Sequence, residues 1–161
     1  VAAWGATACQ VRVEGSDDVS SSGTVRQAMR TAPAETFGYA LCVCGDLDHV
    51  GTLTTEACEG QSANVGTRGR VDLTSGTRIG GSLISGGDVD LVGSVAVRDD
   101  LITLSDLSGV GDLEVGRNLE VGGSLSTVGS LAVGAELAVA EGDDHVGPAR
   151  VGQRDIAKSC G

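Results

Sequence analysis

The sequence predicts an all-β protein, a triangular β-solenoid (β-helix) of hexad repeats with about 18 residues per coil. A leucine recurs every six residues from Leu113 to Leu137 without a slip. The chain has 26 glycines but only 2 prolines, and one residue each of Phe, Trp and Tyr. Six residues is a whole number of strand periods but not of helical turns, so the repeating side chains point the same way in extended chain.

The six-residue phase extends over residues 41–140. Counted from Leu41 to Leu137 it marks 17 positions, and 15 of them are Leu or Val. The exceptions are Glu59 and Thr77. The expected inward stack contains Leu101, Leu107, Leu113, Leu119, Leu125, Leu131 and Leu137.

Each position of the hexad L-x-V-x-G-[D/S/N] has a physical role. The L-x-V tripeptide makes a short strand with two inward side chains, the glycine permits a corner, and the short polar residue can bond to the turned backbone. Three corners close a coil, coils stack about 4.8 Å apart, and residues 41–140 make five to six of them. A sandwich of hairpins is the alternative, but six residues are too few for an ordinary strand and its turn.

The two flanks break the phase. Residues 1–40 contain two short strand-like segments, Val11 to Val13 and Thr24 to Arg26, and one possible helical turn before Pro33. Residues 141–161 begin with Glu141-Gly142-Asp143-Asp144 and are mostly polar. We expect residues 1–40 to be an N-terminal cap or subunit-connecting segment, and residues 141–161 to be a C-terminal tail or cap.

The spacing of the repeat resembles that of the bactofilins, bacterial polymer-forming proteins with a right-handed triangular β-helix. It also resembles the secreted Gly/Val-rich β-helix proteins of GC-rich bacteria. In Leu119-Glu120-Val121-Gly122-Gly123-Ser124 the small residue follows a second aliphatic residue, whereas left-handed hexapeptide coils place it directly after the first. The resemblance covers residues 41–140 and implies a right-handed coil; the cysteines and the expected export depart from the bactofilins, which are typically cytosolic.

The five cysteines lie outside the regular part of the repeat, from Asn64 to Ala140. The sequence begins at Val1 rather than Met, which suggests that a signal peptide has been removed. In an exported protein cysteines favour disulfides and subunit linkage. Cys42 and Cys44 share one side of a strand, so each is expected to pair with Cys9 or Cys58, which leaves Cys160 for an intermolecular bond. Two minor alternatives are lipidation at Cys9 and a zinc site using His49. The residues concerned are Cys9, Cys42, Cys44, Cys58 and Cys160.

Composition limits the possible functions. A net charge of -11 opposes binding to nucleic acid, and no stretch is long and apolar enough to span a membrane. We expect the protein to have no enzymatic activity and to bind no cofactor or metal ion. His145, beside Asp143 and Asp144, is a formal candidate for a catalytic base but is expected in a solvated loop, and acidic corners such as Asp88 and Asp90 are expected to be solvated rather than to bind calcium.

The sequence therefore predicts a non-enzymatic structural protein, extracellular or at the cell surface. Its partner would be itself, joined end to end through strand edges and disulfides into a homopolymeric fibre or surface layer. The alternative is a monomeric, surface-attached module with capped ends that binds a glycan or an ion on a face of the coil.

Overall fold

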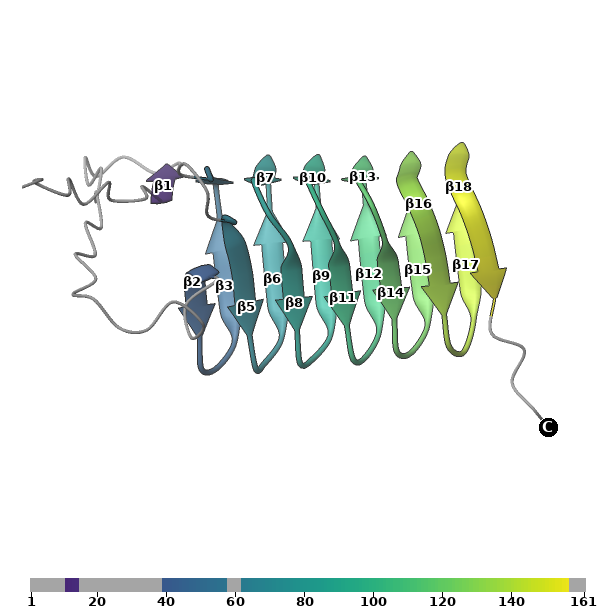
Figure 1. Ribbon diagram of the computed structural model, residues 1–161, viewed down its shortest axis with the longest axis horizontal. Helices are drawn as coiled ribbons and strands as arrows, with labels where there is room; N and C mark the ends of the chain where they lie inside the picture. The colour runs from purple at the N-terminus through teal and green to yellow at the C-terminus, as the bar shows by residue number, and fades with distance from the viewer. Residues whose placement is uncertain (1–10, 15–38, 58–61, 157–161) are drawn as a thin grey trace, which may run out of the picture.

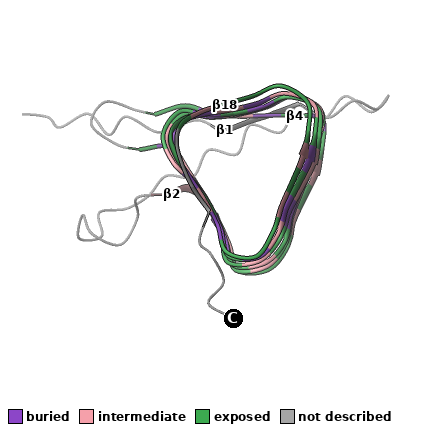
Figure 2. Cartoon of the chain, turned by 90° about the vertical axis from the view of Figure 1, so that its right-hand side faces the viewer, coloured by how far each residue is buried: buried purple, intermediate pink, exposed green. Residues whose placement is uncertain are grey.

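The computed structural model is a parallel β-solenoid of about five turns (Figure 1). It describes residues 11–14, 39–57 and 62–156, and all the regular structure among them is β-strand. We use the word coil for one circuit of three strands. Viewed along its axis the solenoid is triangular (Figure 2), so the predicted fold class is confirmed, while its handedness stays a prediction.

The three sides of the triangle, here faces 1 to 3, are met in that order along the chain. Face 1 contains β2 (Tyr39–Val43), β5 (Asn64–Thr67), β8 (Leu83–Ser85), β11 (Leu101–Thr103), β14 (Leu119–Val121) and the second halves of β16 (Leu131–Val139) and β18 (Ala149–Ile156). Face 2 contains β3 (Leu47–Val50), β6 (Val71–Thr74), β9 (Val89–Val92), β12 (Leu107–Val110), β15 (Leu125–Val128) and β17 (Asp143–Val146). Face 3 contains β4 (Thr52–Thr55), β7 (Thr77–Ile79), β10 (Val95–Val97), β13 (Leu113–Val115) and the first halves of β16 and β18.

The central coils stack in strict register, whereas the pairings of β2 with β5 and of β16 with β18 each contain a one-residue shift. Leu101 pairs with Leu83 on one side and with Leu119 on the other, so each step between coils is one turn of about 18 residues. The first coil is longer by one hexad, because Leu41 pairs with Val65 and Leu47 pairs with Val71. The additional hexad falls between β4 and β5, and it keeps the six-residue phase, so the phase alone does not reveal it.

The first and third residues of each hexad face the interior, as predicted. Leu101, Leu119 and Leu137 are at most 1% exposed, and the second residue of the same strands is half-buried or exposed. Burial of this aliphatic stack is the main stabilising contribution, at roughly 25 cal/mol per Å². All seven predicted core leucines are buried: Leu101, Leu107, Leu113, Leu119, Leu125, Leu131 and Leu137.

The short polar residue at the end of a hexad lies at a corner, and its side chain also forms hydrogen bonds with the neighbouring coil. Asp100 Oδ1 accepts from the backbone N–H of Asn118, in the following coil, at 3.2 Å, and from the Asn118 side chain at 2.9 Å. Asp106 Oδ1 accepts from the Ser124 N–H at 2.7 Å in the same way. These side chains therefore continue the sheet hydrogen bonds around the corners.

The strands continue past residue 140. β17 pairs with β15 in the 18-residue register of one coil. The first half of β18 pairs with β16 in that register, as Leu131 with Ala149, but the register then shifts by one residue and Leu137 pairs with Arg154. The expectation that Glu141 leaves the repeat is therefore wrong, although whether residues 141–161 act as a cap stays a prediction.

At the other end, β1 (Val11–Glu14) lies antiparallel along β4. This agrees with the strand predicted at Val11 to Val13. The strand and helical turn predicted between Thr24 and Pro33 lie outside the described residues.

Candidate functional site

Two of the five cysteines fall within the described residues. Cys42 and Cys44 are exposed and free on the outer side of the chain at β2, while Leu41 and Val43 point inward and are half-buried. This is the arrangement that strand periodicity predicts. Cys9, Cys58 and Cys160 lie outside the described residues, so their disulfides and their subunit linkage stay predictions.

Both histidines occupy the third, inward position of a face 2 strand. His145 lies over Thr127 of the coil before, and its Nδ1 is 2.8 Å from the Thr127 hydroxyl. The Nε2 atoms of His49 and His145 are both buried and have no hydrogen-bond partner. The interpretation of His145 as a solvated loop residue is therefore wrong, because β17 continues the solenoid and turns this ring inward.

The ligands considered for zinc diverge. Cys42 and Cys44 point outward from face 1, whereas His49 points inward from face 2. Within the part of the chain that the structure describes, no three His, Cys, Asp or Glu residues are grouped to hold a metal ion. The same described residues include no helix long and apolar enough to cross a membrane.

The acidic corner residues serve the solenoid itself. Asp88 Oδ1 accepts from the Ser105 hydroxyl, and Asp90 Oδ1 accepts from the Ser108 hydroxyl. Asp100 also lies 3.9 Å from Arg117 Nε. The contacts of Asp88 and Asp100 lie at corners, whereas that of Asp90 joins the neighbouring strands β9 and β12, and all of them link successive coils.

The two ends of the described solenoid present strand edges. Among the described residues β2 has a partner on one side only, β5, and β18 likewise has only β16. A row of backbone bonds illustrates the N-terminal end: the Gly86 N–H donates to Thr67 and the Arg68 N–H donates to Val43. The next donor in this row is the Cys44 N–H, and the described residues form no further coil before it.

Leu41, Leu47 and Val151 lie at the two ends of the aliphatic stack and are only partly buried. An exposed edge with apolar side chains behind it is the feature that favours pairing with another chain.

A row of exposed apolar residues runs along the length of the solenoid, at the corner between faces 2 and 3. Its members are in register as the fourth residues of the face 2 strands, and we call them the valine row: Val50, Thr74, Val92, Val110, Val128 and Val146. The five valines are 47% to 66% exposed. The residue after each member has a positive φ and is glycine in five of the six coils, so this corner has its own backbone geometry.

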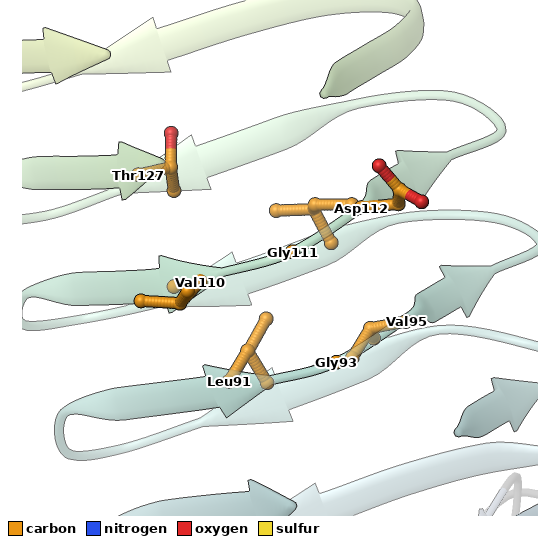
Figure 3. Close-up of a pocket in the computed structure, with 9 residues that line it drawn as sticks. Leu91, Gly93, Val95, Val110, Gly111, Asp112 and Thr127 are labelled. Atoms are coloured by element: carbon orange, nitrogen blue, oxygen red, sulfur yellow. The ribbon is translucent and has the colours of Figure 1, made fainter. Parts of the chain in front are cut away.

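A small gap and an outer groove lie among the described residues. The gap, of about 10 Å³, lies beside Gly109, where the inward position of β12 has no side chain. Figure 3 shows its lining, which comes from β9, β12 and β15 on face 2, from β10 and β13 on face 3, and from the corner between these faces. It is about the size of one water molecule. The groove, of about 460 Å³, lies on the outer side of face 3 between Arg78 and Glu114, over Ser94 and Ala96.

No known family model, curated protein or solved structure matches this chain. The valine row was not predicted from the sequence, although a signal for it exists. At the fourth and fifth positions of the hexad, Val-Gly recurs in every third hexad, at Val92, Val110, Val128 and Val146. This longer period of three hexads is superimposed on the six-residue one.

Proposed function

We propose that the chain is a non-enzymatic structural protein, an exported bacterial β-solenoid subunit that joins end to end into an extracellular fibre or surface layer. The observation that carries the proposal is the pair of open strand edges, β2 at one end of the described coil and β18 at the other. The bactofilin-like repeat supports a polymer-forming role, and the cysteines support an extracellular one. Both histidine rings point into the coil, which supports a role without a catalytic base.

A head-to-tail joint follows from the positions of these edges. On face 1 the outer edge of β18 would pair with β2 of the next subunit. On face 3 the strand β1 already lies against β4, so there β18 would meet β1. The joint would cover Leu41, which is half-buried in the single chain.

The cysteines can make such a joint covalent. Cys42 and Cys44 are free and outward-facing at β2, the strand that receives β18. Cys160 follows the end of β18 at Ile156 by four residues, a reach of roughly 13 Å in extended chain. An intermolecular disulfide from Cys160 to Cys42 or Cys44 would then lock the joint.

Electron microscopy of the purified, non-reduced protein at micromolar concentration tests the proposal. We expect uniform threads with an axial repeat near the length of one subunit, and covalent oligomers on non-reducing gels. Cys160→Ser should abolish the covalent oligomers, whereas Ser159→Ala, which keeps all the thiols, should not. Discrete short particles at every concentration would contradict end-to-end assembly.

A second candidate function is favoured by the groove on face 3. Arg78 at one side and Asp112 and Glu114 at the other frame a floor of small residues, which suits a glycan or an ion on a monomeric, surface-attached module. Calorimetric titration with oligosaccharides and with calcium tests it. Binding that weakens in both Arg78→Ala and Glu114→Gln would support the module, and no binding to the wild type would remove it.

A further inference from the structure

The valine row is an apolar strip on the outside of an acidic protein, and it is confined to one of the three corners. At the corner between faces 1 and 2 the equivalent positions include Arg68 and Gly122, and at the corner between faces 3 and 1 they include Arg98 and Gly116. The valines point away from the aliphatic interior, so burial within a single chain does not account for them. The row runs through six successive face 2 strands, a length of about 24 Å.

We propose that two copies of this chain lie side by side and antiparallel, with the valine row of one against the valine row of the other. This contact is lateral and so goes beyond end-to-end joining. A partner for the row must present apolar groups about 4.8 Å apart over its whole length. A second copy has that spacing, because its own row is set by the same stacking of coils.

The neighbouring outward residues favour the antiparallel arrangement. The second residues of the face 2 strands are acidic in the first three coils, at Asp48, Asp72 and Asp90. They are serines in the next two, at Ser108 and Ser126. A two-fold axis between β9 and β12 sets Asp90 against Ser108 and Asp72 against Ser126, so carboxylates face neutral serines rather than other carboxylates. Like charges then meet only where Asp48 faces Asp144.

The area of the row suggests a weak contact in a single pair. Five valines that are 47% to 66% exposed offer a few hundred Å² per copy. Stable complexes bury about 800 Å² on each partner. Lateral pairing would therefore be reversible between single subunits and would strengthen where many rows act together along a fibre. Because the chain carries a net charge of -11, we also expect added salt to strengthen the pairing.

Three variants test the contact by sedimentation equilibrium and small-angle X-ray scattering. Val110→Lys places a charge near the centre of the row and should weaken lateral association at least tenfold. Leu104→Lys is the matched control, because Leu104 is 73% exposed but lies at the corner between faces 1 and 2. Thr74→Val completes the row and should strengthen association by about twofold to tenfold, since it replaces a hydroxyl by a methyl group in the contact.

Scattering separates this inference from the end-to-end proposal. Lateral pairs double the mass per unit length, whereas end-to-end joining lengthens particles at a constant cross-section. A protein whose cross-section never doubles, or an equal effect of Leu104→Lys and Val110→Lys, would overturn the lateral contact and leave the fibre proposal standing. Side-by-side pairs without threads would support the lateral contact and remove the fibre. Circular dichroism of each variant checks that it has folded.

Discussion

Thr77 is a polar residue inside an aliphatic stack. It lies on face 3 between Leu53 and Val95, is 3% exposed, and its hydroxyl has no hydrogen-bond partner. A buried hydroxyl without a partner loses its bonds to water and gains nothing in return. By contrast, the buried Thr103 hydroxyl donates to the Gly87 carbonyl at 2.8 Å and accepts from the Ser105 N–H at 3.2 Å.

The same substitution at these two residues should therefore have opposite effects. Thr77→Val keeps the shape and removes an unpaired polar group, so we expect it to raise the free energy of unfolding by about 1 kcal/mol. Thr103→Val removes two hydrogen bonds and leaves the Gly87 carbonyl and the Ser105 N–H without this partner, so we expect a loss of about 1–3 kcal/mol. Urea unfolding followed by circular dichroism measures both. A destabilised Thr77→Val variant would contradict this account.

Which residues a corner of the solenoid accepts depends on the backbone conformation at that corner and on how closely the neighbouring coil stacks against it. Gly111 has a φ of 126°, a conformation in which other residues are strained. A Cβ atom added there would also clash with the backbone carbonyl of Gly93 in the coil before. Gly76 lies two coils earlier and one residue further along the same corner, after Ser75, and it has no atom within 4 Å of such a Cβ position.

These two glycines differ both in backbone conformation and in the space beside them. Gly111→Ala should destabilise the protein by about 3 kcal/mol or more, because backbone strain and a clash with backbone add together. Gly76→Ala should change stability little or raise it by about 0.5 kcal/mol through the unfolded state. Thermal unfolding of both variants measures the difference, and equal effects would show that stacking at the corner does not limit side-chain size.

The strands and corners of the repeat could be predicted from the sequence, but the end of the repeat could not. Leu and Val every six residues predict the strands, their inward faces and the triangular coil, because side-chain direction follows directly from strand periodicity. Val11 to Val13 was also found as a strand. The end of the repeat was misplaced because Asp143 and His145 stand where Leu and Val are expected, so hydrophobic pattern alone excluded β17. Val146-Gly147, three hexads after Val128-Gly129, is the signal that identifies it.

The candidate surfaces were less predictable than the fold. Whether Val110 contributes to a core or to an exposed row depends on its place in the whole coil rather than in the six-residue hexad. The free state of Cys42 and Cys44 is likewise a property of the folded chain. The extra hexad of the first coil keeps the phase, so only the pairing of Leu41 with Val65 reveals it.

At the scale of the whole molecule, the solenoid is nearly one-dimensional. Each coil touches only the coils before and after it, so stability is a sum of coil and interface contributions. The coil that contains Leu101 has neighbours on both sides, whereas those that contain Leu47 and Val151 lie at the ends of the described stack. The half-buried state of these end residues fits this difference.

Native-state hydrogen exchange should therefore show a gradient of protection. In dilute, monomeric protein we expect the Leu101 amide, bonded to the Asn118 carbonyl at 2.9 Å, to need the largest opening free energy. The Leu47 and Leu131 amides, bonded to Arg70 at 2.8 Å and to Pro148 at 3.0 Å, should exchange sooner because the end coils can open alone. Equal opening free energies at all three amides would instead indicate one cooperative unit. If the ends pair between subunits, raising the concentration should slow exchange at Leu47 and Leu131 while Leu101 stays unchanged, and this links the stability of the ends to assembly.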